Sequence, residues 1–139
     1  MNNPKVEEFL GIDVGGARIG IARGNSAARL AQPLVTIEAE LAKVRLKDII
    51  KDNKTAGIVV GLPRSLDGGE TPQTKTVRDW VKSVQAEISL PFYWQDEALT
   101  SHHAENSDFR AHQAGPDAIA AAIILQDFLD APENDRVAA

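Results

Sequence analysis

The chain has 139 residues, of which 43% are hydrophobic and 25% charged, and its formal net charge is -5. This length fits one domain with a real core, and the absence of cysteine excludes disulfides, thiolate metal sites and a cysteine nucleophile. No basic segment leads into an apolar run at the N-terminus, and no run reaches the roughly 18 apolar residues of a membrane span. We therefore expect a single cytoplasmic domain over residues 1–139. The negative charge argues against gripping nucleic acid by phosphate neutralisation alone.

The first segments of the chain predict a β-hairpin. Residues 9–14 and 18–23 are two β-rich runs separated by Gly15 and Gly16, which we expect to supply positive φ angles at the turn. A third extended segment follows at residues 32–37. Three arginines and no acidic residue lie within this part of the chain, between positions 14 and 36.

Helical and extended patterns alternate beyond residue 38. An amphipathic pattern begins at Glu38 and ends near "KDNK", and the continuously apolar "AGIVVGLP" then predicts a strand buried on both faces. Thr71 is a candidate N-cap with Pro72 at the first helical position, followed by an apolar stripe that extends to Ile88.

The last third of the chain predicts one more strand and a buried helix. "LPFYWQ" is the strand, a short polar helix is expected within residues 101–112, and Pro116 opens a helix that is apolar nearly all round. The order of elements predicts an α/β fold with a mixed five-stranded sheet, antiparallel at one side and parallel at the other, with helices on both faces. The core is expected over residues 9–130, with a frayed tail at 131–139.

Three acidic residues stand at boundaries of these elements. Asp13 lies inside the first strand, Glu97 follows the strand "LPFYWQ", and Asp117 lies in the first turn of the last helix. A charge in an apolar strand costs several kcal/mol unless it is paired or binds a metal. An ion pair with Arg18 is the competing explanation for Asp13, a solvated strand end for Glu97, and interaction with the helix dipole for Asp117.

These acids can converge on one metal site. Functional groups gather at the carboxyl ends of parallel strands. Ligation by oxygen alone suits Mg²⁺ or Mn²⁺, and two such ions about 3.5 to 4 Å apart activate water and stabilise the leaving oxygen of a phosphodiester. Asp96 is excluded because neighbouring residues of an extended segment point to opposite faces.

Four ordered segments resemble one known family. They are "LGIDVGGARIGIA", "IVVGLPRSLDGGETPQTKTVRDWV", "DEALTSHHAE" and "DAIAAAIILQDFLD". Together they resemble the bacterial YqgF family of pre-16S rRNA nucleases, also described as Holliday junction resolvases, over about residues 9–130. The resemblance implies an RNase H-like fold and a metal-dependent nuclease with Asp13, Glu97 and Asp117 as its catalytic, metal-binding acids. It also implies processing of the 5′ end of pre-16S rRNA, with pre-ribosomal RNA or a ribosomal particle as the partner.

Basic residues are candidates for contacts with substrate. We expect Arg18 and Arg64 to meet phosphates beside the metal ions, with a flexible loop as the competing interpretation of the segment that holds Arg64. His102 and His103 are candidates for proton transfer, and solvated side chains on a polar helix are the competing interpretation. The segment "NSDFRAHQAGP" is short for the family and holds one arginine, Arg110, so the isolated chain should bind nucleic acid weakly and in a salt-sensitive way.

Three other functions compete with this hypothesis. Four-way DNA junctions are a second substrate class, because structured nucleic acid is recognised by shape and backbone more than by a short motif. A catalytically silent module that binds RNA or a partner protein is another. The first segment also resembles the phosphate loop of the sugar kinase and actin ATPase superfamily, but those proteins need two lobes, and 139 residues provide one.

Overall fold

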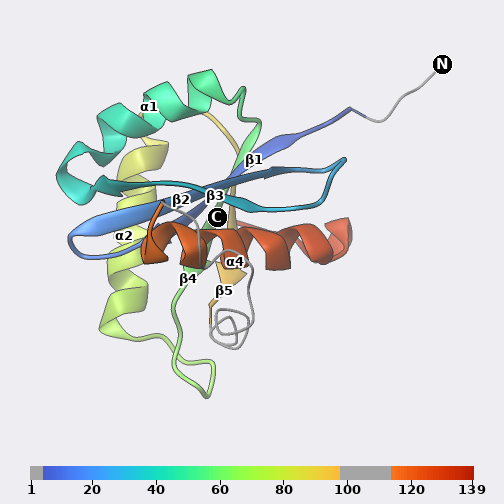
Figure 1. Cartoon of the computed structure of the whole chain (residues 1–139). Helices are drawn as coiled ribbons and strands as arrows, with labels where there is room; N and C mark the ends of the chain where they lie inside the picture. Colours follow the sequence, from blue (N-terminus) through green and yellow to red (C-terminus); the bar gives the residue numbers. More distant parts are fainter. Residues whose placement is uncertain (1–4, 98–113) are drawn as a thin grey trace.

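The computed structural model describes residues 5–97 and 114–139. Its sheet has six strands in the order β3-β2-β1-β4-β5-β6 (Figure 1). The strands are β1 (Glu8–Val14), β2 (Arg18–Asn25), β3 (Gln32–Glu38), β4 (Gly57–Leu62), β5 (Phe92–Asp96) and β6 (Val137–Ala138). The first three pair antiparallel, β1, β4 and β5 pair parallel, and β6 returns antiparallel to β5. The predicted mixed sheet is confirmed, with one strand more than expected.

The additional strand corrects the expectation of a frayed tail at 131–139. Val137 pairs with Trp94 at the edge of the sheet. The guanidinium of Arg136 lies 4.8 Å from the ring centroid of Phe128, within the range of a cation–π contact. A two-residue strand is too short to show an alternating pattern, so it could not be predicted from the sequence. Its place in the sheet becomes visible only through these contacts with residues that are distant in the sequence.

Helices cover both faces of the sheet, as predicted. They are α1 (Ala42–Asp52), α2 (Pro72–Gln85) and α4 (Pro116–Asp130), with short 3₁₀ turns at Ala39–Leu41 and Glu133–Asp135. The helices α1 and α2 pack on one face, and α4 crosses the other (Figure 1). The polar helix expected within residues 101–112 lies outside the described residues. Among the helices that are described, none has the length and apolar character needed to cross a membrane.

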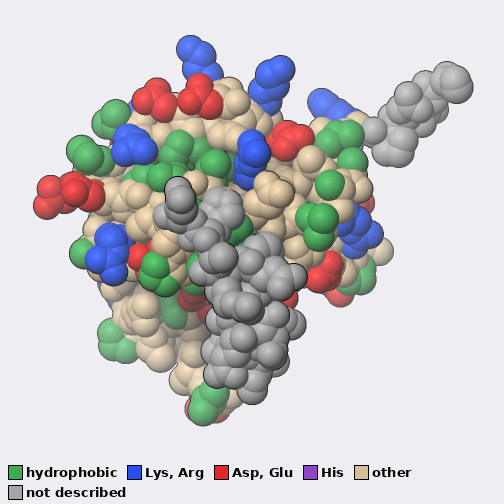
Figure 2. Space-filling view, in the orientation of Figure 1, with side chains coloured by type: hydrophobic (Ala, Val, Ile, Leu, Met, Phe, Trp, Pro, Cys, Tyr) green, Lys and Arg blue, Asp and Glu red, His purple; other side chains and the backbone are tan. Residues whose placement is uncertain are grey.

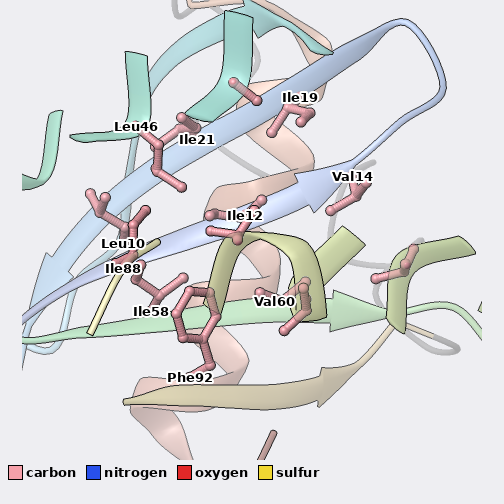
Figure 3. Packing of buried hydrophobic residues seen from close by; sticks show 14 of the residues in the cluster. Leu10, Ile12, Val14, Ile19, Ile21, Leu46, Ile58, Val60, Ile88 and Phe92 are labelled. Carbon is pink, nitrogen blue, oxygen red and sulfur yellow. The ribbon is translucent and has the colours of Figure 1, made fainter. Parts of the chain in front are cut away.

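Alternation along β1 divides its side chains between two cores. Leu10 and Ile12 belong to the core beneath α1 and α2, where large aliphatic side chains meet (Figure 3). Phe9 belongs to the core beneath α4. Because successive side chains of a strand point to opposite faces, Gly11 and Asp13 share the α4 face with Phe9. The carboxylate in the first strand therefore points to the side of the sheet that α4 covers.

Glycines let α4 approach this face closely. A Cβ atom at Gly11 would lie 2.6 Å from Cβ of Leu125 and 2.8 Å from the carbonyl oxygen of Ala121. A Cβ atom at Gly20 would overlap the carbonyl oxygen of Asp117. The backbone of α4 thus rests almost directly on the backbone of β1 and β2, and its first turn is fixed beside Asp13.

The hairpin between β1 and β2 forms, but not through the expected backbone conformation. The glycines with positive φ in the described residues are Gly68 (84°) and Gly115 (97°), not Gly15 or Gly16. The N–H of Gly15 donates to the carbonyl oxygen of Arg18 at 3.0 Å. A Cβ atom at Gly15 would lie 2.6 Å from that oxygen, so close approach is the reason for glycine there.

Candidate active site

The first strand and the last helix bring Asp13 and Asp117 to the same edge of the sheet. Asp13 pairs across the hairpin with Gly20. Asp117 lies in the first turn of α4, with its carbonyl group pressed against Gly20. The start of α4 is held further by Thr36, whose hydroxyl donates to the carbonyl oxygen of Ala114 at 2.7 Å. Gly20, which lies opposite Asp13, is therefore the residue of the sheet that the first turn of α4 contacts.

Glu97 reaches this edge from β5. Its N–H donates to the carbonyl oxygen of Leu62 at 3.3 Å, which continues the pairing between β4 and β5. A Cβ atom at Gly61 would lie 2.8 Å from Cγ and 2.9 Å from Cδ of Glu97. The carboxyl group therefore lies over a position in β4 that has no side chain, and β4 is the strand next to β1.

The carboxyl groups of Asp13 and Glu97 are hydrogen-bonded to each other. Burial raises the pKa of Glu97 to about 8, and the hydrogen bond and charge of Asp13 add to the rise. Burial also raises the pKa of Asp13, the hydrogen bond from Glu97 lowers it, and the charge of Asp117 raises it. These directions place the shared proton on Glu97, which donates to Asp13.

Asp117 has a different immediate partner. Nε of Arg18 lies 2.9 Å from Oδ2 of Asp117, and the two side chains are 66% and 30% exposed. Sequence reasoning considered an ion pair between Arg18 and Asp13, but the structure pairs Arg18 with Asp117. The charge of Asp117 still reaches Asp13, whose pKa it raises.

The donor chemistry of the half-buried pair of Asp13 and Glu97 fits a divalent cation. Two carboxylates side by side repel each other unless a proton or a cation lies between them, and oxygen donors are the ligands that Mg²⁺ and Mn²⁺ prefer. Within residues 5–97 and 114–139, no group of three or more acidic, histidine or cysteine side chains is placed to hold a metal ion. Oδ2 of Asp117, the third acid expected at the site, is instead paired with Arg18.

Arg64 lies on the other side of β5 from the acidic pair. Its Nε lies 3.2 Å from Oδ1 of Asp96. Trp94 packs against the core beneath α1 and α2, so Asp96, two residues later, shares that face, while Glu97 points to the α4 face. Arg64 is therefore held at the end of β5 by Asp96, which is next to Glu97 in the sequence but on the opposite face of the sheet. His102, His103 and Arg110 lie outside the described residues.

Sequence reasoning missed that Gly20 and Gly61 make room for the acids. Both interrupt apolar strands, and an isolated glycine in a strand signals close approach of another group. That signal was available in the sequence, although it does not say which group approaches.

Comparison with known proteins identifies the family. A family model described as "RuvX: Holliday junction resolvase" matches residues 7–131. The chain belongs to the RuvX family. The RuvX relatives include a "Putative pre-16S rRNA nuclease" from Roseiflexus sp. (strain RS-1), 38% identical over 130 residues that cover 87% of this chain and 92% of the relative. A protein of the same name from Fusobacterium nucleatum is 35% identical over 135 residues, covering 90% and 98%. The resemblance to the YqgF nucleases is thereby confirmed.

Solved structures show the same fold in more distant proteins. The RuvX chain is similar to "T. thermophilus RuvC in complex with Holliday junction substrate", with a TM-score of 0.64 and 14% identity over 96% of this chain and 99% of that one. A second Thermus thermophilus RuvC structure gives a TM-score of 0.61 at 13% identity. At this identity the similarity concerns the fold, and it confirms the predicted RNase H-like class.

Proposed function

We propose that this chain is a divalent-metal-dependent nuclease that hydrolyses phosphodiester bonds of structured RNA, in processing of the 5′ end of pre-16S rRNA. The observation that carries the proposal is the half-buried, hydrogen-bonded pair of Asp13 and Glu97, with Asp117 close enough to raise the pKa of Asp13. A fold without a use for this pair would gain stability by replacing it with apolar side chains. Membership of the RuvX family supports the same activity.

The residues have distinct roles in this proposal. Asp13 and Glu97 hold the metal after giving up their shared proton, and Asp117 completes the set of ligands. Bound Mg²⁺ or Mn²⁺, as two ions, supplies an activated water and stabilises the leaving oxygen. Arg18, beside Asp117, and Arg64, at the end of the strand that carries Glu97, bind phosphates of the substrate, because a guanidinium can donate two parallel hydrogen bonds to a phosphate.

The substrate class is supported by the relatives. Their name specifies pre-16S rRNA. Four-way DNA is the second candidate, favoured by the description of the family model and by the fold shared with RuvC. Lys and Arg side chains are scattered among acidic ones on the face that Figure 2 shows. We therefore expect weak, salt-sensitive binding by the isolated chain, which a ribosomal particle strengthens by presenting the RNA.

A cleavage assay on two substrates tests the proposal. A transcript that spans the 5′ end of pre-16S rRNA and a four-way DNA junction are incubated side by side with Mg²⁺ or Mn²⁺ at low salt. Asp13→Asn should lower cleavage by more than about 100-fold while the protein stays folded, since it removes a ligand. Asp79→Asn is the matched control, because Asp79 is an exposed acid of α2 that pairs with Lys75, and it should leave cleavage nearly unchanged.

Each outcome of this assay has a definite meaning. Cleavage of the transcript alone supports the RNA assignment, and cleavage of the junction alone replaces it with resolvase activity. If the wild type cuts neither substrate, or if Asp13→Asn cuts as well as the wild type, the nuclease assignment is wrong. A silent binding module then becomes the better description.

A further inference from the structure

Asp117 interacts with two different groups at once. Its carboxylate is ion-paired with Arg18, and its charge acts on Asp13. We infer that Arg18 is a positioning residue that competes with the divalent cation for Asp117, and that a substrate phosphate releases Asp117 by taking Arg18 away. The inference rests on the proposed function, and it adds that binding of nucleic acid and binding of metal help each other.

The geometry of Arg18 suits an exchange of partners. It is the first residue of β2, it follows the hairpin turn, and its side chain is 66% exposed. Only Nε donates to Asp117; the remaining guanidinium N–H groups donate no hydrogen bond to any residue within 5–97 and 114–139. A guanidinium can donate two parallel hydrogen bonds to a phosphate, and this favours exchange of the single bond to Asp117 for the two bonds to the phosphate.

The geometry of Asp117 confines the exchange to its side chain. Its backbone rests on Gly20, and the preceding turn is fixed by Pro116 and by the hydrogen bond from Thr36 to Ala114. The carboxylate can therefore change partner only by rotation about its own side-chain bonds. Because that carboxylate is partly exposed, the ion pair holding it is weak, and its release corresponds to a factor of up to about five in an equilibrium.

The two ligands are then linked thermodynamically. A phosphate that binds Arg18 weakens its hold on Asp117, which raises the affinity of the acidic site for the cation. By reciprocity, a cation that takes Asp117 leaves Arg18 free and raises the affinity for the phosphate by the same factor. Removing Arg18 should therefore strengthen binding of the metal and weaken binding of nucleic acid. A purely structural role would weaken both or neither.

Calorimetric titration with Mn²⁺, without nucleic acid, tests the metal half. Arg18→Gln should tighten binding of Mn²⁺ by about two- to five-fold, since it removes the competing ion pair. Arg23→Gln is the matched control, because Arg23 is another exposed arginine of β2 and donates to Oδ1 of Asn53 at 3.3 Å. It removes the same charge and should leave the affinity for Mn²⁺ unchanged.

A double-mutant cycle assigns the effect to Asp117. Asp117→Asn should weaken binding of Mn²⁺, and in that background Arg18→Gln should bring no gain. Binding of a labelled structured RNA in EDTA tests the phosphate half, and Arg18→Gln should weaken it while Arg18→Lys restores part of it. The inference is overturned if Arg18→Gln fails to tighten Mn²⁺ binding, if Arg23→Gln tightens it equally, if the gain persists in Asp117→Asn, or if RNA affinity does not change. None of these measurements requires cleavage, so failure of the nuclease assignment remains distinguishable.

Discussion

The two faces of the sheet are packed against their helices in different ways. Beneath α1 and α2, large side chains such as Ile12, Ile21 and Phe92 fill the space between sheet and helices (Figure 3). Beneath α4, the strands present glycines and the helix presents alanines, so backbone approaches backbone. The first face stabilises the fold by burial of apolar area. The second also buries apolar residues, but at one end it leaves room for carboxyl groups.

This difference explains how a small domain accommodates half-buried acids against its sheet. Gly61 provides the space into which the carboxyl group of Glu97 fits, and Gly20 lets the turn that carries Asp117 reach the sheet. Large residues at these two positions would improve the local packing of a strand but would push the acids apart. The small residues beneath α4 therefore serve the geometry of the site as well as the core.

The largest effect should come from adding bulk at Gly20. Gly20→Val places a side chain where the backbone of Asp117 now lies, so α4 must lift from the sheet. We expect a loss of more than about 3 kcal/mol in the free energy of unfolding, at the upper end of overpacking effects because backbone rather than side chain must move. Urea denaturation monitored by circular dichroism measures it.

The matched control for this change is Ile21→Val, one residue along on the opposite face. Ile21 is fully buried beneath α1 and α2, and loss of one methylene should cost about 0.5 to 1.5 kcal/mol. Equal losses at the two positions would contradict the claim that the α4 face is the less tolerant one.

A smaller but more local effect is expected at Gly61. Gly61→Ala adds a Cβ atom against the carboxyl group of Glu97 and against Cδ1 of Ile124. We expect destabilisation of about 1 to 3 kcal/mol, together with weaker binding of Mn²⁺, because Glu97 must shift. Gly16→Ala is the control, since a Cβ atom there meets nothing within 4 Å. Wild-type affinity for Mn²⁺ in Gly61→Ala would show that Glu97 does not depend on this space.

Local features of the fold could be predicted from the sequence, and long-range partners could not. Thr71 and Pro72 do start α2, with a capping box in which Thr71 and Thr74 satisfy each other's backbone. All the residues that decide this helix start are within four positions. By contrast, Arg18 and Asp117 are 99 positions apart. Asp13 stood out in the sequence because it interrupts an apolar run, but nothing local indicates which acid an arginine of the hairpin meets.

The starts of α2 and α4 allow the comparison of the two faces to be sharpened. The start of α2 is held by a local cap, whereas α4 begins at Gly115 without a side-chain cap and depends on the hydrogen bond from Thr36 to Ala114. Thr71→Ala and Thr36→Val should each cost about 1 kcal/mol in stability. Only Thr36→Val should also weaken Mn²⁺ binding, because it loosens the turn that carries Asp117. Calorimetry on both variants tests this, and equal affinities would separate the start of α4 from the site.

The smallest effect concerns the dependence of stability on pH without metal. Burial and the neighbouring Asp13 raise the pKa of Glu97 from its ordinary value of 4.5 to about 8. Between these two pH values, Glu97 holds a proton in the folded protein and has lost it in the unfolded chain. Stability from this group is therefore greatest at low pH and is lost as pH rises through 8. Between pH 7 and 8 the wild type in EDTA should lose no more than about 1 kcal/mol that Glu97→Gln does not lose, because glutamine keeps a hydrogen-bond donor but cannot ionise. Addition of Mn²⁺ should reverse the trend, since the cation replaces the proton and binds better as pH rises. Parallel pH profiles for the two proteins in EDTA would show that Asp13 and Glu97 do not share a proton in the folded state.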